Sequence, residues 1–274
     1  MGTVTVGDVV DVVERHYPPA TAEPWDAVGL AVGERSAPVD RVLLTVDVVP
    51  EVLTEARERG AQLVVAHHPL LLRGLTSVVA EEPKGRLVLA AARDRVAVLT
   101  AHTNADVAVD GVSQALADAL GLVGCRPLVP HGDDPVTGTG RVGRLPEPMT
   151  AAELVEHVAA RVPATATGVR LAGDPARRIS TVALVGGAGD GYLDAARASG
   201  ADAYLTSDLR HHPVSEFLQH EGAPVLLDVA HAAAEATWLP VLARVLADGL
   251  GPDGPEVLLS DVRTDPWTLR SGAR

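Results

Sequence analysis

The chain has 274 residues but only one lysine and one cysteine, and each scarcity excludes a class of site. Because Lys84 is not part of a Gly-Lys-Ser/Thr motif, the phosphate-binding loop of the common nucleotide hydrolases is excluded. Because Cys125 has no second cysteine to pair with, an internal disulfide and a cysteine-rich zinc site are excluded as well. A single cysteine is typical of a reducing compartment, so we expect a cytoplasmic protein.

Long apolar runs and an excess of positive charge are also missing. No stretch reaches the roughly 18 apolar residues that a membrane-spanning helix needs, and the N-terminal residues lack the basic and apolar blocks of a signal peptide. The 23 Lys and Arg residues against 36 Asp and Glu residues give a net charge of -13. This balance opposes a broad electrostatic surface for nucleic acid or anionic lipid, so neither nucleic acid nor a membrane is the partner we expect.

Short apolar runs alternate along the chain with alanine-rich stretches of helical spacing. The runs are rich in Val and Leu and are typical of buried strands, at residues 41–49, 62–68, 95–103, 180–187, 203–208, 224–231 and 256–262. The helical spacing occurs at residues 50–60, 84–94, 113–121, 150–162, 191–200 and 233–249. This alternation and the length predict an α/β fold of two domains with mostly parallel sheets.

A stretch rich in glycine and proline near the middle of the chain, residues 129–144, indicates the domain boundary. We expect residues 1–128 to form a first α/β segment and residues 129–180 a crossing segment made of a loop and a helix. Residues 181–274 form a second α/β segment, whose C-terminal part we expect to return to the first domain. The sequence His-His-Pro follows a predicted strand in both halves, which leaves pseudo-symmetry and coincidence as open alternatives.

Six of the ten histidines fall in or beside polar clusters at the ends of predicted strands. They are His67, His68, His102, His211, His212 and His231. Carboxylates accompany three of these clusters, at Asp106, Asp208 and Glu235. Ligands of α/β proteins bind where the carboxyl ends of strands meet, and imidazole with carboxylate suits divalent Zn, Mn, Fe, Co or Ni. The clusters together therefore predict a divalent-metal site.

The spacing within these clusters raises two geometric conditions. Side chains of neighbouring strand residues point to opposite faces, so His67 and His68 serve one pocket only if the chain turns before Pro69, and otherwise each takes a different metal. His231 and Glu235 are four residues apart, which places them on one face if the segment is helical. Each residue alone also has a structural interpretation, such as a hydrogen-bonded core histidine or a helix cap, so the metal prediction depends on the joint cluster.

The glycine-rich turn at residues 186–192 follows a predicted strand and precedes a helical stretch. Its glycines do not match the G-x-G-x-x-G pattern of dinucleotide-binding loops, so we interpret it as a tight turn.

An ordered set of motifs spans nearly the whole chain. It consists of Trp25-DAVGL, His67-HPLLLRG, Ala101-HTNADVAVDG, Gly140-RVGRLPEP, Ser207-DLRHHP and Asp228-VAHAAAE. Over roughly residues 6–265 this set resembles the dinuclear-metal-centre hexameric family, also called Nif-three-like and often labelled GTP cyclohydrolase 1 type 2 homolog. The resemblance implies a two-domain α/β fold, a dinuclear metal site between the domains, and a homohexamer.

The resemblance also assigns roles to individual residues. It places the metal ligands on His67, His68, Asp106, His231 and Glu235, and a further pocket histidine on His102. It implies two divalent ions per protomer, Zn, Mn, Fe or Co, and leaves the roles of His211 and His212 unassigned. Where the family tends to have Gly-His-Tyr-Ala-Thr-Glu, this chain reads Ala230-His-Ala-Ala-Ala-Glu, so the ligands are kept while two hydroxyl groups are lost. Any chemistry that used those hydroxyls is thereby in doubt.

Five ligands for two ions leave coordination positions for water, which favours catalysis. We predict metal-dependent hydrolysis of a phosphate ester or nucleotide, with His102 as a catalytic proton-transfer group. A non-catalytic metal-binding assembly or regulatory protein is one alternative, and the GTP cyclohydrolase activity of the family label is another. Threading of nucleic acid through a ring is a third, which would require arginines gathered on the inner wall of the ring.

Overall fold

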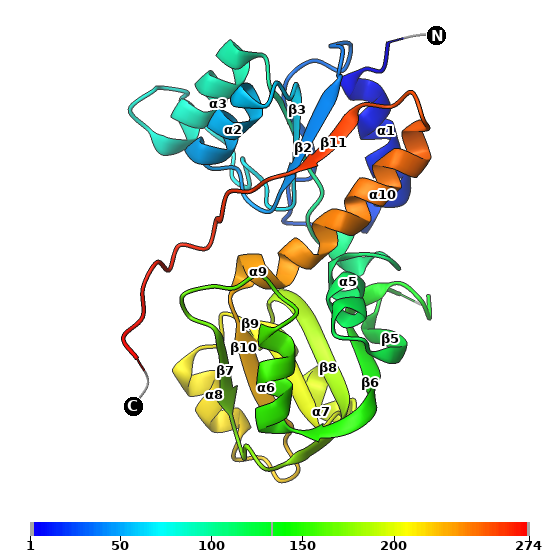
Figure 1. The fold of residues 1–274 in the computed structure, drawn as a ribbon, viewed down its shortest axis with the longest axis vertical. Helices are drawn as coiled ribbons and strands as arrows, with labels where there is room; N and C mark the ends of the chain where they lie inside the picture. The colour runs from blue at the N-terminus through cyan, green and yellow to red at the C-terminus, as the bar shows by residue number, and fades with distance from the viewer. Residues whose placement is uncertain (1–2, 133, 273–274) are drawn as a thin grey trace. The chain divides into compact units, whose positions relative to one another are not determined.

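The computed structural model describes residues 3–132 and 134–272, and these form two compact units, each built on one sheet (Figure 1). The first unit runs to Ala105 and resumes over Leu239–Thr264, while the second takes Asp106–Trp238 and the residues from Asp265 onward. The α/β class predicted from the sequence is confirmed. Among the described residues, no helix is both long and apolar enough to cross a membrane.

The first unit has a five-stranded sheet in the order β1-β4-β3-β2-β11. Its strands are β1 (Gly29–Val32), β2 (Arg41–Thr45), β3 (Leu63–Ala66), β4 (Ala97–Thr100) and β11 (Glu256–Leu259). Four of them are parallel, and only β1 is antiparallel to its neighbour β4. This sheet matches the expected mostly parallel layer, and its last strand comes from the C-terminal part of the chain.

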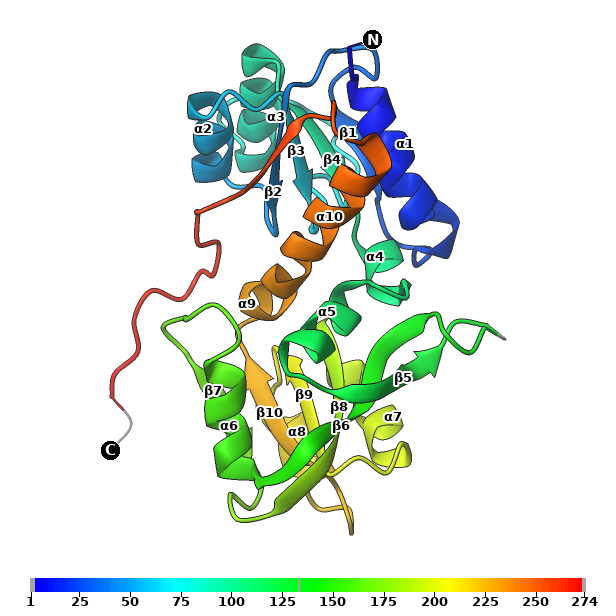
Figure 2. The same cartoon turned by 45° about the vertical axis from the view of Figure 1, so that its right-hand side comes forward.

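Helices cover both faces of the first sheet. They are α1 (Val6–His16), α2 (Pro50–Glu58), α3 (Pro83–Asp94) and α10 (Leu239–Leu250), with a short 3-10 helix η1 (Pro19–Thr21). Figure 2 shows α2 and α3 on one side of the sheet and α1 with α10 on the other. The side chains of Thr5 and Asp8 cap the start of α1 reciprocally, and its valines are spaced to bury one face.

The second unit has a six-stranded sheet in the order β5-β6-β8-β9-β10-β7. Its strands are β5 (Val123–Pro130), β6 (Gly138–Thr150), β7 (Val169–Ala172), β8 (Arg178–Ala188), β9 (Ala203–Ser207) and β10 (Val225–Val229). Its helices are α5 (Val112–Ala119), α6 (Ala151–Ala159), α7 (Leu193–Ala198), α8 (His211–Phe217) and α9 (His231–Glu235), with 3-10 turns η2 (Asp190–Tyr192) and η3 (Ala236–Trp238). The division between the units falls inside α4 (Thr103–Val107) and again after η3.

The second sheet is mixed, which departs from the mostly parallel sheet predicted there. Only β8, β9 and β10 are parallel, whereas β5, β6 and β7 pair antiparallel with their neighbours. The segment 129–180, expected as a loop and helix crossing, contributes strands β6 and β7 to this sheet as well as α6. The glycines of β6 are the reason that its sequence predicted a loop. A Cβ on Gly140 would lie 2.7 Å from the carbonyl oxygen of Leu184, so the close approach of β6 to β8 requires glycine at this position.

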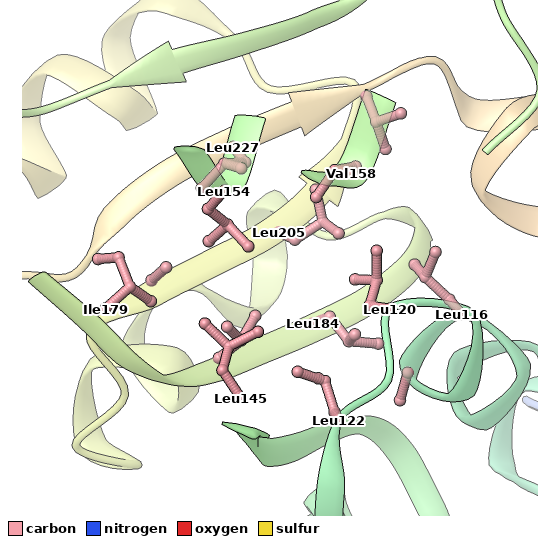
Figure 3. Packing of buried hydrophobic residues seen from close by; sticks show 14 of the residues in the cluster. Leu116, Leu120, Leu122, Leu145, Leu154, Val158, Ile179, Leu184, Leu205 and Leu227 are labelled. Atoms are coloured by element: carbon pink, nitrogen blue, oxygen red, sulfur yellow. The ribbon is translucent and has the colours of Figure 1, made fainter. Parts of the chain in front are cut away.

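One hydrophobic core of the second unit lies between one face of its sheet and helices α5 and α6, and a second core packs α7 and α8 on the other face. Helix α6 begins at a capping box formed by Thr150 and Glu153 and buries Leu154 and Val158 at helical spacing. Figure 3 shows these two side chains facing leucines of strands β8, β9 and β10. This packing fixes the carboxyl ends of the three parallel strands, from which the functional side chains of this unit project.

Candidate metal centre

Three histidines of the first unit lie together at the carboxyl ends of the parallel strands β3 and β4. His67 and His68 follow β3, and His102 follows β4 two residues after its end. The ring centroids are 5.1 Å apart for His67 and His68, 5.2 Å for His67 and His102, and 5.5 Å for His68 and His102. One nitrogen of each ring lies within 4.8 Å of the others, a set that could hold a metal ion.

A bend of the chain at His67 and His68 brings both rings to one side. The amides of these residues still donate to the carbonyl oxygens of Thr45 and Val46, at 3.1 Å and 2.8 Å, but the regular strand ends before them. Of the two arrangements that the sequence allowed, the structure therefore has the one in which the chain bends and the two neighbouring imidazoles lie together. His67 is fully buried, while His68 and His102 are half-buried.

Each of these imidazoles has its Nδ1 atom against a hydrogen-bond acceptor. Nδ1 of His67 lies 2.9 Å from the carbonyl oxygen of Ala101. Nδ1 of His68 lies 2.7 Å from Oδ1 of Asp47, and Nδ1 of His102 lies 2.8 Å from Oδ1 of Asp26. A ring that donates from Nδ1 carries its lone pair on Nε2, which is the usual arrangement for a histidine that ligates a metal.

Asp26 is held as a charged carboxylate beside His102. Its side chain is inaccessible to solvent, and its second oxygen accepts from the amide of Thr103 at 3.0 Å and from the hydroxyl of Thr103 at 2.5 Å. Burial opposes the charge, but the hydrogen bonds from Thr103 and His102 outweigh it and lower the pKa of Asp26. Burial and the neighbouring His67 lower the pKa of His102, which favours a neutral ring able to accept a proton.

In the second unit, His231 and Glu235 form a pair on α9. His231 begins the helix, and its Nε2 lies 2.8 Å from Oε1 of Glu235 one turn later. On the other side of the ring, Nδ1 lies 2.6 Å from Oδ2 of Asp208. Glu235 is only 3% exposed, so this carboxylate sits in an interior where a cation is its most favourable neighbour. The helical spacing predicted from the sequence thus places the pair on one face.

The last residues of strand β8, which the sequence predicted to be part of a tight turn, pass directly against this pair. Gly187 has a left-handed backbone with φ of +78°, and a Cβ there would lie 2.5 Å from Oε1 of Glu235 and 3.1 Å from Nε2 of His231. The carbonyl oxygen of Gly187 accepts from the hydroxyl of Thr206 at 2.9 Å, which ties the end of β8 to the neighbouring strand β9. Glycine at this position therefore allows a close approach of the backbone to the pair of candidate metal ligands.

The remaining predicted site residues are placed differently. Asp106 lies half-buried on α4, one turn after His102. It does not belong to the group of His67, His68 and His102, whose ligand atoms lie within 4.8 Å of one another. His211 and His212 open α8 and are exposed, whereas His67 and His68 follow their strand directly. The two His-His-Pro sequences therefore have different local structures.

Two carboxylates that contact the histidine cluster were not predicted as site residues. Asp26 was part of a quoted motif but carried no role, and Asp47 was overlooked although it follows the apolar run of β2. The position of Asp47 beyond a strand end is a signal that the sequence offers. No local signal joins Asp26 to His102, because 76 residues separate them.

The sequence matches the family described as Duf34/NIF3 (NGG1p interacting factor 3) over residues 4–266. The chain belongs to the DUF34/NIF3 family. A relative from Streptomyces coelicolor, named GTP cyclohydrolase 1 type 2 homolog, is 48% identical over 267 residues, covering 96% of this chain and 93% of the relative. A relative of the same name from Mycobacterium tuberculosis is 33% identical over 373 aligned positions, covering 97% of each chain. That alignment exceeds 274 positions, so the mycobacterial relative carries residues that this chain lacks.

Two solved structures share the fold of this chain. A Bacillus cereus protein related to NIF3 has a TM-score of 0.90 at 22% identity and covers 98% of this chain and 100% of its own. A Staphylococcus aureus hypothetical protein has a TM-score of 0.89 at 25% identity, with the same coverage. The resemblance drawn from the sequence motifs is thereby confirmed at the level of family and fold.

Proposed function

We propose that this protein binds two divalent metal ions per protomer and uses them to hydrolyse a phosphate ester or nucleotide. The proposed ligands are His67 and His68 from the first unit and Asp106, His231 and Glu235 from the second. The observation that carries the proposal is the cluster of three imidazoles whose Nδ1 atoms are all engaged by acceptors.

The donor set fits a divalent transition metal. Neutral imidazole nitrogens and carboxylate oxygens are the ligands that Zn, Mn, Fe and Co share, and a site without thiolate favours none of the softer ions. At His231, Asp208 accepts from Nδ1, and Nε2 lies 2.8 Å from Oε1 of Glu235, so one imidazole nitrogen and one carboxylate oxygen converge. Either a proton or a metal ion between these two atoms makes the contact favourable, and a bound ion takes the place of the proton.

Divalent ions, when bound, supply a Lewis acid that lowers the pKa of water and stabilises charge on a phosphoryl group. The part of the chain itself would be proton transfer and orientation. His102 is a neutral imidazole with Asp26 on Nδ1, so its Nε2 is the atom that accepts a proton and then returns it. Asp26 stabilises the imidazolium formed in between, because its carboxylate stays charged.

Metal analysis on purified protein tests the binding part of this proposal. After removal of metal with a chelator and reconstitution with Zn, Mn, Fe or Co, we expect two ions per chain. His67→Ala and Glu235→Ala should each lower this number, while the matched control His212→Ala, at an exposed histidine outside the cluster, should keep it. No more than trace metal after reconstitution would overturn the proposal.

A panel of substrates tests the catalytic part. The metal-replete protein is assayed on an activated phosphoester, cyclic nucleotides and nucleotides including GTP, with Glu235→Ala as the blank. Release of phosphate supports hydrolysis, whereas release of formate from GTP would favour the ring-opening activity that the names of the relatives suggest. Activity of the wild type no higher than the blank on every substrate would leave the non-catalytic metal-binding assembly.

We also propose a homohexamer in the cytoplasm, which rests on the family resemblance and on the preference of oligomers for closed symmetry. Six chains of 28.4 kDa have a mass of about 170 kDa, which light scattering coupled to size exclusion measures directly. A monodisperse species of one chain across micromolar concentrations would contradict the hexamer.

A further inference from the structure

The two units use the same arrangement to support one histidine each. In the first unit, Asp47 lies two residues beyond β2, and it contacts His68, two residues beyond the neighbouring parallel strand β3. In the second unit, Asp208 lies directly beyond β9, and it contacts His231, two residues beyond the neighbouring parallel strand β10. The carboxylate-to-Nδ1 distances are 2.7 Å and 2.6 Å. A strand-end aspartate thus serves the strand-end histidine beside it in both sheets.

The backbone at Asp208 is unusual. Its φ is +59°, and among the described residues only one other non-glycine residue, Arg95, has a positive φ. Arg95 terminates helix α3, where a left-handed residue is the ordinary way for a helix to end. Asp208 follows a strand and ends no helix, so its conformation needs another explanation.

Neighbouring contacts hold Asp208 in this conformation. The amide of the next residue, Leu209, donates to Oδ1 of Asp228 at 3.3 Å. Arg210 donates from Nε and Nη2 to Oδ2 of Asp190, at 2.9 Å and 2.5 Å. The segment is therefore tied to strand β10 and to the 3-10 helix η2 directly after the left-handed residue. These hydrogen bonds maintain a left-handed conformation that costs of order 1–2 kcal/mol in an L residue. In this conformation the carboxylate of Asp208 contacts His231.

We propose that Asp47 and Asp208 are positioning residues of the metal centre, one in each unit. Each carboxylate keeps a proton on Nδ1 of its histidine and fixes the ring, so that Nε2 is the atom presented to metal. This inference rests on the proposed metal binding but assigns roles to residues outside the ligand set. The positioning role of Asp208 matters most, because Glu235 lies against Nε2 of His231 and competes with Asp208 for the proton of the ring.

Nitrogen-15 NMR of the histidine rings tests the first consequence on metal-free protein near pH 8. We expect Nδ1 of His68 and of His231 to carry a proton in the wild type. In Asp47→Ala and Asp208→Gly the corresponding proton should move to Nε2, where for His231 the carboxylate of Glu235 accepts it. Nδ1 atoms without protons in the wild type, or unchanged protonation in both variants, would overturn the inference.

Metal affinity and stability together separate positioning from a merely structural role. Asp208→Gly removes the carboxylate but suits the left-handed backbone, so the urea midpoint of the metal-free variant should equal or exceed that of the wild type. Its affinity for Zn or Co, measured by competition with a chromophoric chelator, should nevertheless fall about 10- to 100-fold. The control Asp194→Ala, at an exposed aspartate paired with Arg197, should bind within twofold of the wild type.

The outcomes distinguish this inference from the proposed function. Asp208→Gly and Asp47→Ala that bind metal as tightly as the control would refute the positioning role while leaving metal binding intact. A wild type that binds no metal would refute the proposed function, and the NMR result on metal-free protein would still decide whether the two carboxylates set the proton position.

Discussion

Replacing Gly187 with alanine should disturb the proposed metal ligands of the second unit through a single added carbon atom. The new Cβ would lie 2.5 Å from Oε1 of Glu235, whereas carbon-to-oxygen contacts shorter than 3.0 Å essentially never occur in proteins. The carboxylate must therefore retreat by about 0.5 Å or more. It cannot turn outward into solvent, since Glu235 is 3% exposed, and the end of β8 cannot withdraw easily, since Thr206 holds the carbonyl of Gly187.

The backbone cost of this substitution has a matched control in the same unit. Gly200 has φ of +75°, close to the +78° of Gly187, but a Cβ there would meet nothing within 4 Å. Left-handed alanine costs about 1–2 kcal/mol, which is offset by about 0.4–1 kcal/mol because alanine has fewer unfolded conformations than glycine. Gly200→Ala should therefore lose about 1 kcal/mol of stability with no effect on metal binding.

The difference between the two variants isolates the contact with the ligands. A ligand displaced by this amount should weaken metal binding about 10- to 100-fold, which corresponds to about 1.4–2.7 kcal/mol. Urea denaturation of the metal-free proteins measures the backbone cost, and competition with a chromophoric chelator measures the affinity. If Gly187→Ala binds Zn or Co as tightly as Gly200→Ala, Glu235 is not a ligand and the argument from this geometry is wrong.

Three further substitutions probe other parts of the structure. Arg141 is 2% exposed and donates to the carbonyl oxygens of Ala108 and three other residues. Arg141→Met should therefore lower the free energy of unfolding, measured by urea denaturation, by about 3 kcal/mol or more. The control Arg144→Met, at an exposed arginine, should stay within about 0.5 kcal/mol of the wild type. His102→Ala should slow turnover by about 10²- to 10⁴-fold with metal content unchanged, and a loss of metal would instead identify His102 as a ligand. Asp26→Asn should be less stable than the wild type above the ordinary pKa of 3.8, because the folded protein lowers the pKa of Asp26. This difference in unfolding free energy should shrink as the pH falls through the lowered value, and a difference that grows on acidification would contradict the assignment.

Features that depend on neighbours in sequence were predicted well. The spacing of His231 and Glu235 placed them on one helical face, since four residues make about one turn. The apolar runs before His67 and His102 became adjacent parallel strands, and the rule that such strands end at one edge brought the histidines together. The α/β class followed from the same alternation of strand and helix.

The alternation of strand and helix did not predict the direction of the strands in the second sheet. Strand β6 contains Gly140 and other glycines because its neighbours approach closely, and glycine in a sequence indicates a turn more often than a strand. Strand β6, which pairs antiparallel with β5, was therefore not predicted, because its first residues lie in the stretch 129–144 that was interpreted as a loop or domain crossing.

The sequence by itself determined the family, the alternation of strands and helices, and the histidines that gather at strand ends. Only the tertiary structure decided which acceptor each imidazole meets. His68, His102 and His231 contact aspartates that are 21, 76 and 23 residues away in the chain. These partners are chosen by the order of strands in a sheet and by the path of the loops beyond them. Neither is encoded in a local pattern, because hydrogen bonds between distant side chains form only after the sheets have fixed where each loop begins.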